Sequence, residues 1–218
     1  MHKLVTKILP SVFWEAHEKT NPKSAPLMVV LHGRGDSPDG FAWMPEALAI
    51  PGLSYLMVQA PDEYYTGYSW YDLPPNQEPG ILRSRKLLQI IMNELVEQGV
   101  LLKNVFLFGF SQGCLMTIDF GSRFETVLAG YIGISGYVFR EDQLLSEANP
   151  LVKNADWLVT HGTRDDVLPF AETRAQIKKL IEGGFKMTYL EYPKGHTIDD
   201  QQELLMLRDW LVTRIEKL

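Results

Sequence analysis

Ser111 lies in a sequence context that exposes a hydroxyl group to a reactant. The apolar run at residues 105–108 is typical of a buried strand, and the residues that follow the serine have the spacing of a helix. Between the two stands a Gly-x-Ser-x-Gly motif, Gly109-Phe110-Ser111-Gln112-Gly113. A side chain raised on such a strand-to-helix turn needs a strained backbone, and the flanking glycines leave it room. The pattern therefore predicts a nucleophilic serine.

Carboxylates and an imidazole come later in the chain, each after another apolar run. Asp165 and Asp166 follow residues 157–160, and His196 follows residues 187–192. A serine hydroxyl is a poor nucleophile at neutral pH until a base takes its proton, and a carboxylate fixes the tautomer of that base. The order serine, aspartate, histidine is typical of nucleophile-elbow hydrolases. We predict His196 as the base, and this reasoning alone leaves its partner open between the two aspartates.

Acyl transfer through a serine also requires two N–H groups that bind the oxyanion. The backbone amide of Gln112, directly after the nucleophile, is the first expected donor. The second normally comes from a loop after an earlier strand, and residues 31–36 provide such a loop. Because Gly33 and Gly35 let this loop approach closely, we predict the backbone amide of Arg34 as the second donor.

The segments that must position these residues alternate between strands and helices. Residues 4–9 and 12–17 are predicted to form two early strands, paired as an antiparallel edge. Further strands are predicted at residues 27–31, 55–59, 105–108, 128–134, 157–160 and 187–192, and helices at 41–50, 81–98, 170–181 and 199–218. Such alternation predicts the α/β class, with a mostly parallel central sheet flanked by helices. Reactive groups gather at the carboxyl ends of the strands in such sheets, which is where the candidates lie.

Composition limits the classes of protein that the chain can be. With 218 residues and 45% hydrophobic residues, a single domain over residues 1–218 is expected. A net charge of −6 without any basic block argues against nucleic-acid binding. No apolar run approaches the roughly 18 residues that span a bilayer, and residues 1–10 lack the apolar stretch of a signal peptide. Cys114 is the only cysteine, so we expect no intrachain disulfide and a cytoplasmic location.

Four segments, in this order, resemble the phospholipase/carboxylesterase family of serine hydrolases, which includes acyl-protein thioesterases and lysophospholipase-like carboxylesterases. They are Leu31-His32-Gly33-Arg34-Gly35-Asp36, Ser69-Trp70-Tyr71-Asp72, the motif around Ser111, and His161-Gly162-x-x-Asp165-x-x-Leu168-Pro169, after which Gly195-His196 matches the base. The resemblance runs from about residue 27 to residue 196. It implies an α/β-hydrolase fold and a catalytic triad of Ser111, Asp165 and His196. The family's acid is the third residue after the His-Gly pair, which selects Asp165 over Asp166.

Two residues depart from the pattern of this family. Cys114 stands where the family usually has a further glycine, and Arg34 stands where it has an apolar residue between the oxyanion-loop glycines. Any residue but proline keeps the backbone donor, so the oxyanion hole is expected to survive. We hypothesise that the Arg34 cation lies at the acyl mouth and favours substrates that carry an anionic group.

The sequence thus predicts a carboxylesterase that acts on a small-molecule ester or thioester with a short to medium acyl chain. A lysophospholipase or acyl-protein thioesterase is the alternative, and a non-catalytic ligand-binding protein on a hydrolase scaffold is the alternative from another class. The acyl pocket is predicted from four aromatic residues, with core packing as the other interpretation: Trp43, Trp70, Tyr71 and Phe170. No cofactor is implied, and no metal site is predicted because the His and Cys residues lack ligand spacing. The oligomeric state stays open, with a homodimer as one alternative.

Overall fold

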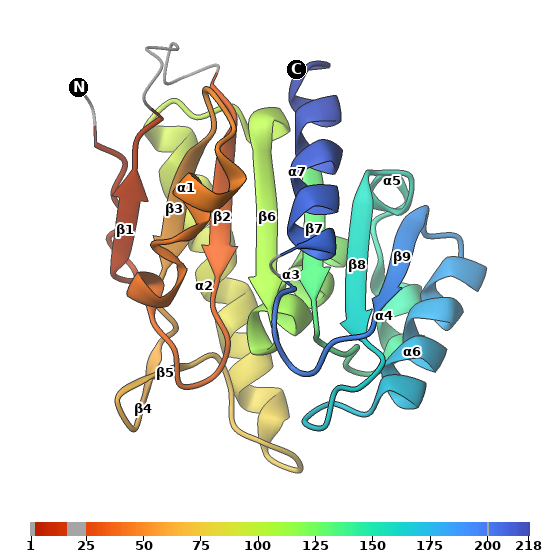
Figure 1. The fold of residues 1–218 in the computed structure, drawn as a ribbon. Helices are drawn as coiled ribbons and strands as arrows, with labels where there is room; N and C mark the ends of the chain where they lie inside the picture. Colours follow the sequence, from red (N-terminus) through yellow and green to blue (C-terminus); the bar gives the residue numbers. More distant parts are fainter. Residues whose placement is uncertain (1–2, 17–24, 200) are drawn as a thin grey trace.

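A computed structural model of the chain describes residues 3–16, 25–199 and 201–218. Its centre is a seven-stranded sheet in the order β1-β3-β2-β6-β7-β8-β9 (Figure 1). The strands are β1 (Ser11–Trp14), β2 (Leu27–Leu31), β3 (Ser54–Val58), β6 (Val105–Phe110), β7 (Gly130–Ile134), β8 (Trp157–Gly162) and β9 (Met187–Tyr192). Only β1 is antiparallel to its neighbour in this sheet, which confirms the prediction of a mostly parallel α/β fold.

Helices cover both faces of the sheet, because the central strands are apolar on both sides. β2, β3 and β7 are buried at every residue. One face packs against the 3-10 helix η1 (Pro38–Phe41), α1 (Met44–Leu48) and α7 (Gln202–Ile215). The other face packs against α2 (Gln77–Glu97), α3 (Gln112–Arg123), α4 (Glu141–Glu147), α5 (Pro150–Lys153) and α6 (Phe170–Glu182). Two hydrophobic cores therefore hold the sheet in place.

The strand order reverses at β2, and this reversal brings two predicted site loops together. β2 has β3 on one side and β6 on the other, and Leu31 at its end pairs with Gly109 of β6. Because these strands are parallel, their carboxyl ends meet at the same edge of the sheet. The loop at residues 32–36 consequently begins beside the motif of Ser111.

The strand predicted at residues 4–9 is wrong. Those residues form no strand, because the N–H groups of Val5 and Lys7 bond to side chains at the C-terminal end of α2 and that of Thr6 bonds to Ser11 Oγ. Val5 donates to Gln98 and Lys7 donates to Glu94, at 3.1 and 2.8 Å. The antiparallel edge is formed by β1 and β3, and part of the predicted strand at 12–17 lies outside the described residues.

Several short elements escaped the sequence prediction. They include the hairpin of β4 (Asp62–Tyr64) and β5 (Gly67–Ser69), the 3-10 helix η2 (Leu102–Asn104), α4 and α5. Each is too short to show a hydrophobic period. The hairpin matters for the site, because the N–H of Gly35 donates to Tyr68 of β5 at 2.8 Å and so fixes the loop after β2.

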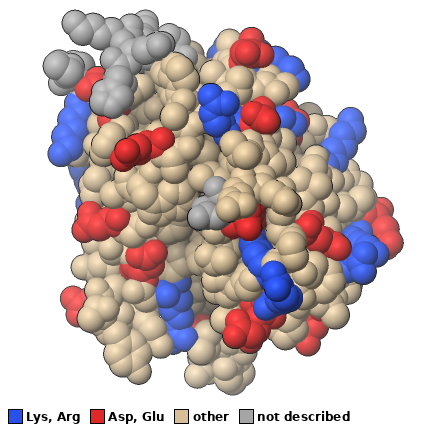
Figure 2. Space-filling model, viewed as in Figure 1, with Lys and Arg blue, Asp and Glu red and all other residues tan. Residues whose placement is uncertain are grey.

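The carboxyl ends of the parallel strands and the carboxyl end of α7 lie at opposite ends of the molecule. The parallel strands point towards one end, while α7 leads to the C-terminus at the other (Figure 1). On the face in Figure 2, acidic and basic side chains alternate among the described residues without forming a continuous basic patch. None of the helices in the described part of the chain is long and apolar enough to cross a membrane.

Candidate active site

The turn between β6 and α3 holds Ser111 in a strained conformation. Its φ of 55° and ψ of −114° lie outside the regions that a side chain favours, and its N–H donates to Ile134 at 2.9 Å. A Cβ on Gly109 would overlap the carbonyl group of Gly113, and a Cβ on Gly113 would overlap that of Leu31. The strain therefore lies at the serine, and the two glycines provide the space that lets α3 turn back against the sheet.

The predicted nucleophile, base and acid are hydrogen-bonded in series. His196 Nε2 lies 2.9 Å from Ser111 Oγ, and His196 Nδ1 lies 2.8 Å from Asp165 Oδ2. His196 follows β9 and Asp165 follows β8, as the sequence predicts. The Asp165 carboxylate is fully buried, whereas Asp166 is exposed and takes no part in this series. In the tautomer that Asp165 favours, Nδ1 donates to the carboxylate and Nε2 accepts from the serine hydroxyl.

Two backbone N–H groups hold the second oxygen of the acid. Asp165 Oδ1 accepts from Val167 at 3.0 Å and from Leu168 at 2.8 Å. Burial alone raises the pKa of Asp165, but the bond from Leu168, the contact with His196 and the bond from Val167 outweigh it and hold the pKa below its ordinary value. Asp165 is consequently a carboxylate at neutral pH, which is the form that can orient an imidazole.

The two amides expected to bind the oxyanion flank the serine on different loops. Gln112 is the first residue of α3, so its N–H has no partner inside the helix and lies at the positive end of the helix dipole. The loop after β2 runs directly beside the turn, since a Cβ on Gly33 would lie 3.3 Å from the Cβ of Ser111. The amide of Arg34 follows in that loop. The role of both amides stays a prediction.

The side chain of Gln112 has a second role that sequence reasoning missed. Its Oε1 accepts from Ser69 Oγ at 3.1 Å and from Trp70 N at 2.9 Å, and its Nε2 donates to the Tyr71 carbonyl at 2.7 Å. The Trp70 indole N–H donates to the His32 carbonyl at 2.9 Å. The Ser-Trp-Tyr segment is therefore bonded both to the serine turn and to the loop of residues 32–36.

We expect Gln112→Ala to destabilise the protein, because it leaves buried partners without hydrogen bonds. Each such group costs about 1–3 kcal/mol, so the free energy of unfolding should fall by about 2–4 kcal/mol in urea denaturation. Gln89→Ala is the control, since Gln89 bonds only to exposed Asn93 and its loss should change stability by less than about 0.5 kcal/mol. Equal stability of the two variants would contradict this role.

An apolar cavity of about 460 Å³ opens beside His196. Its lining comes from the loop after β2, from η1 and α1, from the end of β6, from the loop before α7 and from α7 itself. The lining residues are Asp36, Gly40, Phe41, Trp43, Ala47, Phe110, His196, Thr197, Ile198 and Leu204. Trp43 is thus the one predicted pocket residue in this lining. A larger cavity of about 580 Å³ lies between β1 and α1 and contains none of the three hydrogen-bonded residues.

Three of the pocket predictions need correction. Trp70 and Tyr71 are buried in the core, because the Gln112 side chain draws their backbone under the serine turn. Phe170 is the first residue of α6, and its ring stacks with that of His161 at 6.4 Å between ring centres. It is not part of the cavity lining. The Arg34 guanidinium lies 4.0 Å from the centre of the Tyr64 ring and is also absent from that lining, so the hypothesised cation at the acyl mouth lacks support.

Cys114 is accommodated by two glycines, Gly133 on β7 and Gly136 just after that strand. A Cβ on Gly133 or Gly136 would collide with the Cys114 side chain, so the extra volume of the thiol occupies space that these glycines leave. Burial raises the pKa of this thiol to about 12. Cys114 is therefore a small core residue and does not compete with Ser111 as a nucleophile.

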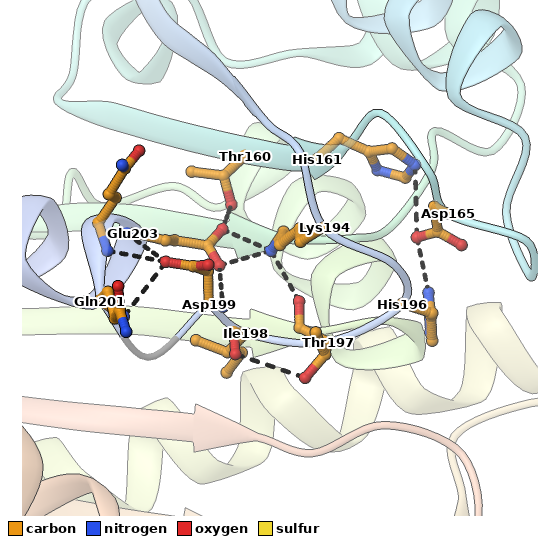
Figure 3. Close-up of polar contacts among 11 residues, drawn as sticks. Thr160, His161, Asp165, Lys194, His196, Thr197, Ile198, Asp199, Gln201 and Glu203 are labelled. Carbon is orange, nitrogen blue, oxygen red and sulfur yellow. Dashed lines mark hydrogen bonds and ion pairs between the residues drawn. The ribbon is translucent and has the colours of Figure 1, made fainter.

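A second imidazole lies behind the acid. His161 is fully buried, its Nε2 donates to the Leu168 carbonyl at 3.0 Å, and the same atom lies 3.6 Å from Asp165 Oδ2 (Figure 3). Burial lowers the pKa of His161, although Leu168 and Asp165 oppose the shift. Burial also lowers the pKa of His32, although the hydrogen bond with the Gly33 carbonyl and the charge of Asp36 oppose this shift. Both imidazoles are thus neutral in the folded protein at neutral pH.

Because the pKa values of His32 and His161 are lowered in the folded protein, we expect the protein to lose stability in mild acid. Below about pH 6.5 the unfolded chain binds protons at both imidazoles, while the folded chain does not until the pH is lower. The free energy of unfolding should therefore fall as the pH drops from 7 to 5, by at most about 1.4 kcal/mol per pH unit for each histidine. His161→Gln should flatten this dependence in urea denaturation at each pH. An unchanged slope would contradict the prediction.

The residues that the structure describes contain no group of three or more His, Cys, Asp or Glu side chains that could hold a metal ion. A hydroxyl, an imidazole and a carboxylate in series can form and hydrolyse an acyl-serine.

Comparisons with known proteins agree with this chemistry. Residues 15–215 match the model of the phospholipase/carboxylesterase family. The chain is 28% identical to carboxylesterase SOBER1 of Arabidopsis thaliana over 85% of this chain and 89% of that protein. It is 27% identical to acyl-protein thioesterase 1 of Schizosaccharomyces pombe, over 83% and 88% of the two chains.

Solved structures agree at the level of the fold. The crystal structure of Arabidopsis SOBER1 superposes with a TM-score of 0.78 at 27% identity, over 87% of this chain and 99% of that one. The Bacillus cereus carboxylesterase superposes with a TM-score of 0.79 over 96% of each chain, and at 18% identity it supports the fold alone.

Proposed function

The chain belongs to the phospholipase/carboxylesterase family of ester hydrolases, and we propose that it cleaves carboxylic esters through an acyl-enzyme on Ser111. The observation that supports this proposal is the hydrogen-bonded series from Ser111 through His196 to buried Asp165. The series lies beside the apolar cavity, so an acyl chain bound there would place its carbonyl carbon near the serine hydroxyl.

The geometry supports a two-step reaction. Ser111 Oγ attacks the carbonyl carbon while His196 Nε2 takes its proton, and the amides of Arg34 and Gln112 bind the oxyanion. The tetrahedral intermediate collapses, His196 returns the proton to the leaving alkoxide or thiolate, and the acyl group remains on the serine. Water then attacks the acyl-serine with His196 as base, which releases the acid and restores the hydroxyl.

We propose a carboxylesterase for short to medium acyl chains as the first candidate. Phe41, Trp43 and Phe110 line the cavity of about 460 Å³, and these apolar side chains support the binding of an acyl chain there. A thioesterase or lysophospholipase is the second candidate, and the relative named acyl-protein thioesterase supports it. The buried, unpaired Cys114 suits a protein that acts in the reducing cytoplasm.

A panel of substrates separates these candidates. p-Nitrophenyl esters of increasing acyl length should show the highest kcat/KM for short to medium chains, above those of matched acyl thioesters and lysophospholipids. A higher kcat/KM for the thioesters or lysophospholipids would select the second candidate. If folded protein neither hydrolyses any of them nor reacts with a fluorophosphonate at Ser111, the non-catalytic binding protein would replace both.

A further inference from the structure

A buried ion pair that the reaction above does not use lies next to the loop that carries His196. Lys194 Nζ lies 2.6 Å from Glu203 Oε1 and 2.5 Å from Oε2, and the two side chains are 3% and 0% exposed. Lys194 comes two residues before His196, and Glu203 lies in the first turn of α7 (Figure 3). An ammonium and a carboxylate so far from water need good geometry and further hydrogen bonds.

The pair has both. Lys194 uses its third donor on the Thr197 carbonyl at 2.7 Å. Glu203 accepts two more bonds, one from the Thr160 hydroxyl and one from the N–H of Asp199 at 2.8 Å. An ammonium has three donors and a carboxylate accepts about four bonds, so the cluster is fully satisfied. Its geometry is consequently well defined.

The partners of the pair lie on both sides of His196. Lys194 precedes the histidine, whereas Thr197 and Asp199 follow it, so the loop between β9 and α7 is anchored at both ends. Figure 3 shows these contacts gathered around Lys194 and Glu203, within the bend of the loop. Between the two anchors the backbone has little freedom to move His196.

The strand β8, which precedes the loop of Asp165, lies against the loop that carries His196. Thr160 is in β8, and after that strand the N–H of Arg164 donates to the Lys194 carbonyl at 3.1 Å. A Cβ on Gly162 would overlap the same carbonyl group, so only glycine allows this close approach. The acid loop, the base loop and α7 therefore meet at Lys194 and Glu203.

We propose that Lys194 and Glu203 are positioning residues, which hold His196 in reach of Ser111 by fixing the backbone of residues 194–199. The inference rests on the proposed function, in which His196 is the base. Replacement of a buried ion pair by apolar residues of similar volume is often neutral for stability. A displacement of about 1 Å at a catalytic group, in contrast, can cost about 10²-fold in rate. The two effects can therefore be separated by experiment.

The double variant Lys194→Met/Glu203→Leu removes both charges together and leaves neither one buried alone. We expect it to unfold cooperatively and to stay folded at the assay temperature, although its melting temperature falls because the Thr160 hydroxyl, the Asp199 N–H and the Thr197 carbonyl lose their partners. Its kcat for a p-nitrophenyl ester should be lower by about 10²-fold, with KM unchanged. The rate at which a fluorophosphonate labels Ser111 should fall in parallel. Arg174→Met/Glu191→Leu is the control, because this exposed pair, 2.9 Å apart, joins α6 to β9 outside the loop. It should keep the wild-type kcat.

A folded double variant with the wild-type kcat would overturn the proposal. If the double variant does not fold, Thr160→Val provides the test, since it keeps both charges and removes only one hydroxyl donor to Glu203. We expect kcat to fall by about tenfold, as for one lost hydrogen bond, with KM unchanged, and an unchanged kcat would again overturn the proposal. Wild-type protein that neither hydrolyses esters nor labels at Ser111 would instead refute the proposed function.

Discussion

Ser111→Ala is expected to lower kcat for ester hydrolysis by at least about 10⁴-fold while the protein stays folded. The variant keeps the amides of Arg34 and Gln112, so some binding of the substrate carbonyl remains, but no hydroxyl is left to form an acyl-enzyme. Hydrolysis of a p-nitrophenyl ester and mass spectrometry after fluorophosphonate treatment would measure the two consequences. The wild type should gain one adduct at Ser111, and the variant should gain none.

Ser135→Ala is a matched control for this variant. Ser135 also has a positive φ, 51°, and is buried in the segment Gly133-Ile134-Ser135-Gly136, but its hydroxyl has no hydrogen-bond partner among the described residues. Its removal should leave both the kcat and the labelling close to those of the wild type. If Ser111→Ala remained active, or if the adduct formed at another residue, the assignment of the nucleophile would be wrong.

Asp165→Asn is expected to lower kcat by about 10⁴-fold at neutral pH. The amide cannot fix the Nδ1–H tautomer of His196 and cannot stabilise the imidazolium that forms when the base takes the proton. The pKa of Asp165 is held below its ordinary value, so the wild-type carboxylate is charged throughout the neutral range and the charge itself is what the variant loses. Steady-state kinetics at pH 7, with circular dichroism to verify the fold, would measure the effect.

The neighbouring carboxylate gives a control of identical chemistry. Asp166→Asn changes an exposed side chain and should keep the wild-type kcat. The opposite outcome, with Asp166→Asn inactive and Asp165→Asn active, would reverse the assignment. Equal losses in both variants would mean that the two aspartates share the role.

The places of Ser111, Asp165 and His196 in the chain could be predicted because each follows a local sequence pattern, although only the family resemblance selected Asp165 over Asp166. Ser111 stands in a turn motif whose glycines meet a steric need, and Asp165 and His196 each follow an apolar strand. In a parallel sheet, such loops must come together at one edge. The order of the strands brings the loop after β2 close to the serine turn, because β2 and β6 are neighbours in the sheet.

Contacts between distant segments explain what the sequence did not predict. Trp70 and Tyr71 have the character of pocket residues, but bonds to Gln112, more than 40 positions away, place them in the core. Residues 4–9 have the composition of a strand, yet the N–H groups of Val5 and Lys7 bond to side chains at the C-terminal end of α2. The buried pair could not be predicted, because Lys194 lies in the loop after β9 and its partner Glu203 lies in α7.

The site loops and the C-terminus lie at opposite ends of the molecule, and this placement has a practical consequence. The loops that carry Ser111, Asp165 and His196 lie at the carboxyl ends of the strands, and the C-terminus, which follows α7, lies at the opposite end of the molecule (Figure 1). A tether or fusion partner attached after Leu218 would therefore orient the reactive edge away from the support. Immobilised in this way, the protein would present the cavity beside His196 to the solution.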